Sequence, residues 1–136
     1  MSWRDTTPQA VQDDMDDLLD AALDLAEEHL TKSGEFVPFG LAIDADGRTK
    51  LFGFATGDAR QAQKLAFDAL KDMRTEIRAA AVATDVSLPE TGMSGIEVHI
   101  EHANGPAIGV LKPYALENGA IRAEPLEGFT ATRAIW

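Results

Sequence analysis

Apolar and polar residues alternate most clearly between positions 96 and 111. The apolar set is Ile96, Val98 and Ile100, and the polar set between them is Glu97, His99 and Glu101. A period of two is typical of a strand with one buried face, and the Asn104-Gly105 pair that follows indicates a tight turn. A three-residue loop ending in a left-handed Gly105 pairs Ile100 with Ile108 and keeps one face apolar, whereas a two-residue loop sets Ile100 opposite Gly109. We therefore predict a β-hairpin in the first of these registers.

Two segments carry apolar residues at spacings of three and four, which is the pattern of an amphipathic helix. The first extends over about 8–30, with Thr6 or Thr7 as its expected N-cap. The second extends over about 59–77, with Asp58 as its expected N-cap. The outer face of the first helix is strongly acidic, while the second helix is nearly balanced in charge.

Shorter apolar runs predict the remaining strands. Residues 36–43 and 50–54 are expected to form a hairpin, because an Asp-Gly pair between them suits a tight turn. A further strand is expected over 80–88, before the 96–111 hairpin. The segment 121–136 offers one or two short strands.

The predicted element order is helix, β-hairpin, helix and β-meander. This order predicts a single α+β domain over residues 1–136, in which two helices pack on a mostly antiparallel sheet. The order resembles that of roadblock- and profilin-like domains, a likeness of fold that carries no function.

The charge and the absence of cysteine limit the classes of function that the chain could have. The chain has 23 acidic residues against 12 Lys and Arg, a formal net charge of −11, and no cysteine. A nucleic-acid partner is disfavoured because phosphate binding requires a basic surface, and disulfides and thiolate metal sites are excluded. No apolar run approaches the roughly 18 residues of a membrane-spanning helix. We therefore expect a cytoplasmic protein with no membrane partner and no cofactor.

The candidate surface site consists of Glu97, His99 and Glu101, which should share one face of their strand. Carboxylate and imidazole groups bind divalent transition metals or act as an acid-base pair. The simpler interpretation is the exposed polar face of an amphipathic strand, because neighbouring positions on one flat strand converge poorly on a single ion. The sequence therefore assigns no metal ligand.

Two other polar residues occur within apolar strands. His102 has core-facing parity, so we interpret it as a structural histidine. Asp85 is expected on an exposed face, because a buried carboxylate would need partners or a raised pKa. No phosphate-binding loop, dinucleotide-binding glycine motif, nucleophile elbow or zinc-protease motif occurs. No catalytic residue is assigned, and an enzyme with an unfamiliar site stays open.

Several short segments stand out together: Glu35-Phe36-Val37-Pro38-Phe39-Gly40, the Asp46-Gly47 turn, Asp85, the strand from Ile96 to His102, and Pro113-Tyr114. They resemble a family of small, uncharacterised bacterial proteins that have an E-F-x-P-F-G segment and an I-E-V-x-I-E-H strand. The resemblance extends from about residue 15 to the end of the printed sequence. The family has no known activity, so the resemblance implies no functional residues.

The leading hypothesis for function is a non-enzymatic, cytoplasmic protein-interaction module. Its candidate partner face is the acidic side of the first helix, formed by Asp13, Asp16, Asp17 and Asp20, which favours a basic protein partner. An exposed sheet edge also allows a homodimer. Two alternatives stay open. One is a small metal-binding protein or enzyme that uses Glu97, His99 and Glu101, and the other is an immunity protein, since such proteins are often small and acidic.

Overall fold

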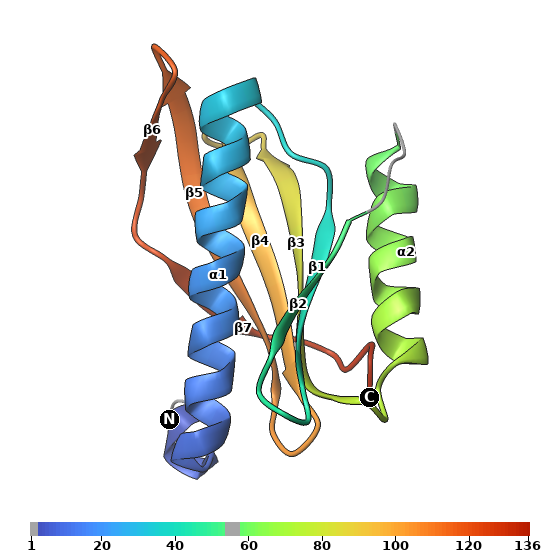
Figure 1. Ribbon diagram of the computed structural model, residues 1–136. Helices are drawn as coiled ribbons and strands as arrows, with labels where there is room; N and C mark the ends of the chain where they lie inside the picture. Colours follow the sequence, from blue (N-terminus) through green and yellow to red (C-terminus); the bar gives the residue numbers. More distant parts are fainter. Residues whose placement is uncertain (1–2, 54–57) are drawn as a thin grey trace.

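The computed structural model describes residues 3–53 and 58–136. Its elements in chain order are the short 3-10 helix η1 (Trp3–Thr6), α1 (Gln9–Ser33), β1 (Phe39–Asp44), β2 (Thr49–Phe52), α2 (Ala59–Asp72), β3 (Ile77–Leu88), β4 (Met93–His102), β5 (Ala107–Glu117), β6 (Ala120–Ala123) and β7 (Glu127–Thr130). The strands form one antiparallel sheet in the order β2-β1-β3-β4-β5-β6, and β7 also pairs with β5. Helices α1 and α2 lie on opposite faces of this sheet (Figure 1). The predicted α+β class and element order are confirmed.

The β4–β5 hairpin has the predicted register. Ile100 lies opposite Ile108, and Val98 lies opposite Val110. The backbone N–H of Gly105 donates to the carbonyl of His102, which closes the loop. The left-handed backbone predicted for Gly105 is wrong, because its φ is not positive. On its other side β4 pairs with β3 along its whole length, so β4 is a central strand of the sheet.

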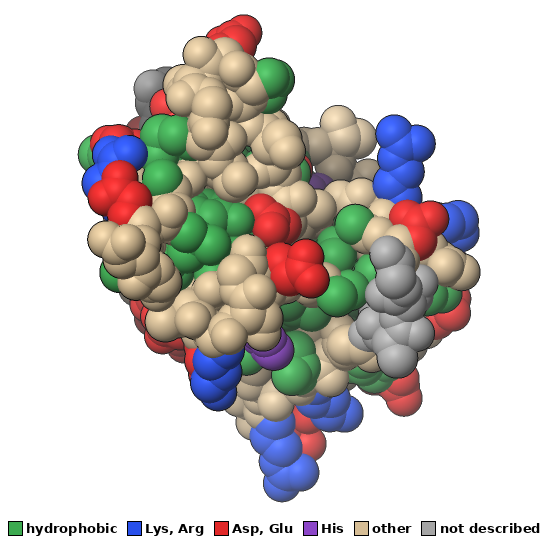
Figure 2. Space-filling model, turned by 90° about the horizontal axis from the view of Figure 1, so that it is seen from above, with side chains coloured by type: hydrophobic (Ala, Val, Ile, Leu, Met, Phe, Trp, Pro, Cys, Tyr) green, Lys and Arg blue, Asp and Glu red, His purple; other side chains and the backbone are tan. Residues whose placement is uncertain are grey.

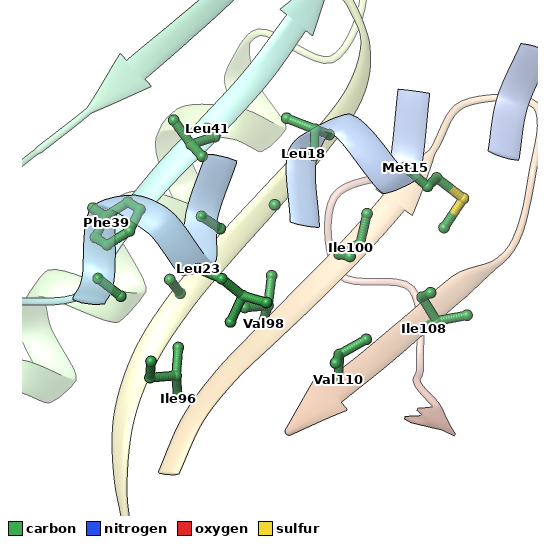
Figure 3. Close-up of a cluster of buried hydrophobic side chains, with 14 of the residues drawn as sticks. Met15, Leu18, Leu23, Phe39, Leu41, Ile96, Val98, Ile100, Ile108 and Val110 are labelled. Atoms are coloured by element: carbon green, nitrogen blue, oxygen red, sulfur yellow. The ribbon is translucent and has the colours of Figure 1, made fainter. Parts of the chain in front are cut away.

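Helix α1 packs on one face of the sheet and forms the main core with it. The side chains of α1 that are buried against the sheet are Val11, Met15, Leu18, Ala22, Leu23, Ala26 and Leu30. They meet apolar residues of β1, β4 and β5, as Figure 3 shows for Met15, Leu18 and Leu23. The helix ends at Gly34, whose left-handed backbone (φ 79°) lets its N–H donate to the carbonyl of Leu30. At its start the N-cap position is Pro8 rather than Thr6 or Thr7, and no side chain caps it.

A smaller core lies between the sheet and α2. Leu70 of α2 packs over β1, where a Cβ on Gly40 would lie only 3.2 Å from the Leu70 side chain. The glycine therefore allows the helix to approach the strand closely. The other buried members of this core are Ala42, Ala66, Ile77, Ala80, Val82 and Ile135. Asp58 caps α2 as predicted, accepting hydrogen bonds from the backbone N–H groups of Arg60 and Gln61.

Several boundaries differ from the sequence-based expectation. Helix α2 ends at Asp72 instead of reaching Ile77, because residues 73–76 form a turn and Ile77 begins β3 in the smaller core. Strand β1 begins at Phe39 instead of Phe36, since Pro38 has no N–H to contribute to a strand pair. The expected end of the 50–54 strand lies outside the described residues. Of the one or two short strands expected within 121–136, two are present: β6, which begins one residue earlier at Ala120, and β7.

Within the described part of the chain, no helix combines the length and the apolar character that a membrane crossing requires.

The core packing of α1 predicts a large penalty for truncating Leu18. This side chain is only 1% exposed, so Leu18→Ala should lower the free energy of unfolding by about 2–5 kcal/mol through lost burial and the cavity left behind. The matched control is Leu65→Ala on α2, where the leucine is 37% exposed and the change should stay within about 0.5 kcal/mol. Urea denaturation followed by circular dichroism measures both. Equal losses in the two variants would contradict this account of the core.

Candidate functional site

The carboxylate of Glu101 is fully buried on the α2 side of the sheet. Its residue exposure is 0%, and its two oxygens accept hydrogen bonds from three successive backbone N–H groups, those of Ala134, Ile135 and Trp136. His99 Nε2 lies 2.6 Å from the same carboxylate. The prediction that this residue lies on an exposed polar face is therefore wrong. The alternation of β4 distinguishes two faces, but it does not show that a distant backbone segment covers the polar one.

Burial raises the pKa of Glu101, but the hydrogen bonds from His99 and from the N–H groups of Ala134 and Trp136 outweigh burial and leave the pKa below its ordinary value. The carboxylate therefore stays ionised at neutral pH. It fixes segment 131–136 against the sheet, and Ile135 enters the α2-side core. Sequence reasoning missed this role. The apolar pair Ile135-Trp136 hinted at a core contact but not at its partner.

His99 is also enclosed. Its side chain is 15% exposed, and the ring of Phe67 on α2 meets it edge to face at 5.2 Å between ring centres. The residue opposite it on β5 is Gly109, over which the Phe129 ring lies so closely that a Cβ there would be 2.1 Å from a ring carbon. His99 and Glu101 therefore form a packed, hydrogen-bonded pair.

Glu97 lies apart from this pair. It forms no hydrogen bond or ion pair with another described residue, and its cross-strand neighbours are Thr84 on β3 and Leu111 on β5. The structure thus brings together two of the three candidate residues and leaves Glu97 toward the open part of the sheet. The described residues contain no group of three or more His, Asp or Glu side chains positioned to hold a metal ion.

His102 projects from the opposite face of β4 and contacts α1. Its Nδ1 accepts a hydrogen bond from the backbone N–H of Asn104, so the ring proton is assigned to Nε2, which donates to Asp14 at 2.9 Å. Arg78 binds the same carboxylate through two nitrogens. Burial raises the pKa of Asp14, but the hydrogen bonds from Arg78 and His102 prevail and lower it. This network joins α1 to β3 and β4, and a structural interpretation of His102 fits it.

Asp85 is half-buried on the α1 side of the sheet, so its predicted exposed position is wrong. It accepts a hydrogen bond of 2.8 Å from the Tyr114 hydroxyl, whose residue is 4% exposed. Burial is the main cause that raises the pKa of Asp85, and the nearby charge of Glu35 raises it further. Asp85, which the sequence pattern placed in solvent, therefore has a hydrogen-bond donor on β5.

The acidic face of α1 is only partly free. Asp13, Asp17 and Asp20 are exposed, whereas Asp16 is half-buried and binds Arg4 at 2.6 Å. The predicted partner face therefore consists of three available carboxylates, to which Asp24 adds a fourth along the same side of the helix.

A groove opens on the other face of the sheet. Helix α2 packs mainly on β1 and β3, and segment 131–136 covers the end of β4 that carries Glu101. On this side of the sheet, the halves of β3, β4 and β5 that lie away from Glu101 therefore stay uncovered (Figure 1). We call this hollow of about 740 Å³ the Leu111 groove. Its lining residues are Leu88, Pro89, Glu90, Thr91, Met93, Leu111, Pro113, Glu124, Pro125, Leu126 and Glu127.

The Leu111 groove has an apolar floor and an acidic rim. Gly95 helps to form the floor, because a Cβ there would lie 2.6 Å from the Leu111 side chain. Three of the chain's six prolines line the groove, which limits its flexibility before a ligand binds. Glu90 and Glu127 stand at the rim, Glu97 lies beside Leu111, and no Lys or Arg belongs to the lining. These three glutamates form no ion pair with a described residue, whereas Glu124 lies 3.4 Å from Arg122.

Comparison of the chain with protein-family models, curated proteins and solved structures finds no match.

The buried carboxylate predicts how stability depends on pH. Because the folded pKa of Glu101 lies below its ordinary value of 4.5, its stabilising contribution is complete above that pH and is lost as the pH falls through the folded pKa. Glu101→Gln should lower the free energy of unfolding at neutral pH by about 1.5–3 kcal/mol, since the N–H groups of segment 131–136 lose a charged acceptor. The difference in stability between Glu101→Gln and the native protein should become smaller in acid, because the native Glu101 carboxylate is then protonated as well.

The matched control is Glu97→Gln, which removes an identical charge from the same face of β4, where no partner is bound. Urea denaturation at a series of pH values should show little change in this variant. If Glu97→Gln and Glu101→Gln destabilise the protein equally, the carboxylate does not hold segment 131–136.

Proposed function

We propose that the protein is a non-enzymatic interaction module that binds a basic, partly apolar segment of a partner protein in the Leu111 groove. The observation that carries this proposal is an apolar groove floor on an uncovered half of the sheet, bordered by glutamates without a cation in the lining. Exposed apolar area of this kind gains free energy when a partner covers it. An immunity protein would be one form of such a module, with a toxin as its partner.

The apolar and the acidic residues of the groove contribute differently to binding. Leu111, Met93 and Leu126 offer apolar contact, which supplies affinity without selecting charge. Glu90, Glu97 and Glu127 then favour Lys or Arg beside the apolar side chains of the partner, and they repel an acidic segment. The exposed aspartates of α1 lie on the opposite side of the sheet, so they can attract a basic partner at a distance but cannot contact a segment in the groove.

To test the proposal, peptides that bind the whole chain are selected from a random displayed library. We expect enrichment in Lys and Arg alternating with apolar residues. The triple variant Glu90→Gln, Glu97→Gln, Glu127→Gln should weaken the selected peptides roughly tenfold, because each rim pair contributes up to about 1 kcal/mol. Leu126→Ser should weaken them as well, since Leu126 is an exposed part of the groove wall. Fluorescence anisotropy at physiological salt measures the affinities.

The matched control is Asp13→Asn, Asp17→Asn, Asp20→Asn, which removes the same three negative charges from α1 and should change affinity less than the groove triple does. If the aspartate triple alone abolishes binding, the partner surface is the acidic helix. Selection of acidic or charge-free peptides would refute a site specific for basic segments.

A further inference from the structure

A second pocket lies on the α1 side of the sheet, away from the Leu111 groove. It occupies about 450 Å³ between the last turns of α1 and the β1–β2 hairpin, and we call it the Phe36 pocket. Its lining residues are Leu25, His29, Ser33, Glu35, Phe36, Val37, Pro38, Phe39, Leu51 and Gly53. Its volume falls within the range of pockets that hold small molecules.

The interior of the Phe36 pocket is aromatic and its mouth is apolar. The rings of Phe36 and Phe39 meet edge to face with centres 5.9 Å apart, and both residues are buried. At the mouth, Val37 is 46% exposed and Leu51 is 57% exposed, which is the highest value among the described large hydrophobic residues. A ligand with an aryl or alkyl body would cover these side chains and gain the free energy of their burial.

The polar side of the pocket has one carboxylate, that of Glu35, and its other polar side chains are the hydroxyl of Ser33 and the imidazole of His29. Glu35 is exposed at the lining and forms no ion pair with a described residue, and its charge is close enough to act on the half-buried Asp85. Helix α1 also ends here, and the C-terminus of a helix carries partial negative charge. Lys32, the basic residue of the last turn, is bound to Glu28 at 2.8 Å and does not line the pocket.

Figure 2 shows the end of the molecule at which α1 terminates. Hydrophobic, acidic and histidine side chains lie toward the middle of this view, and Lys and Arg side chains lie toward its outline together with further acidic ones.

We propose that the Phe36 pocket binds a small organic ammonium ion, whose apolar body packs on Phe36, Phe39 and Leu51 and whose charge faces Glu35 and the end of α1. This site is independent of the Leu111 groove, because it lies on the other face of the sheet and has its own lining. The apolar body supplies affinity, and the carboxylate selects cations over anions of the same shape. The class thus comprises arylalkyl and alkyl amines.

Three probes of nearly equal shape test the selectivity: 2-phenylethylammonium, neutral 2-phenylethanol and anionic 3-phenylpropionate. Each is titrated into the whole chain at neutral pH while backbone amide signals are followed by NMR. We expect the ammonium to shift signals within residues 25–39 and 51–53 and to bind at least about tenfold more tightly than the carboxylate, a difference of about 1.4 kcal/mol. The alcohol should lie between the two.

Two variants separate the contribution of the carboxylate from that of the apolar surface. Glu35→Gln should reduce affinity for the ammonium severalfold and leave affinity for the alcohol unchanged, since only the cation uses the charge. Leu51→Ser should weaken both ligands. Glu90→Gln, in the Leu111 groove, is the matched charge control and should leave the titration unchanged.

Three results would overturn the proposal. One is binding of the carboxylate as tight as that of the ammonium, and another is a set of shifted signals outside the Phe36 pocket. The third is no shift with the ammonium up to roughly 10 mM, a dissociation constant too weak for a selective site. Loss of peptide binding in the groove variants has no bearing on these outcomes.

Discussion

The antiparallel pairing of β4 with β3 and β5 is the constraint on which the rest of the structure depends. Because successive side chains on a strand face opposite sides, this pairing sends Ile96, Val98 and Ile100 toward α1 and the intervening polar residues toward the α2 side. A slip of one residue would bury three polar groups under α1 and move three aliphatic side chains to the α2 side, away from the main core. Both the main core and the polar network of Glu101 therefore require this single register.

The two faces of the sheet are covered unequally, and both candidate sites follow from that inequality. Helix α1 has 25 residues and spans its face, while α2 has 14 and packs mainly on β1 and β3. Segment 131–136 extends the cover on the α2 side, because Glu101 binds its backbone N–H groups. What remains uncovered there is the Leu111 groove. On the α1 side, the Phe36 pocket opens where the helix ends and the chain turns toward β1.

Local patterns predicted the helices, the hairpin register and the element order, because those features depend on periodicity and turn chemistry within a few residues. They failed where a partner came from far along the chain. Glu101 can be buried because backbone N–H groups more than thirty positions away offset the free-energy cost of removing its carboxylate from water. Asp85 can be half-buried because the Tyr114 hydroxyl on β5 donates a hydrogen bond to it. Alternation separates two faces of a strand but does not identify what covers each. Glu97 was a candidate from its strand pattern, but its place beside Glu90 and Glu127 in one groove was not predicted, because these segments meet only in the folded sheet.

The negative charge of the chain has two different consequences for recognition. Charge spread along α1 and over the surface acts at long range, is screened by salt within about 10 Å, and raises the rate of encounter with any cation. It cannot distinguish one basic partner from another. The Leu111 groove and the Phe36 pocket each set carboxylates beside an apolar surface of defined shape, so a ligand must match the charge and the apolar contact together. Since burial of apolar surface is little affected by moderate salt, selectivity at either site should persist under conditions that remove the long-range attraction.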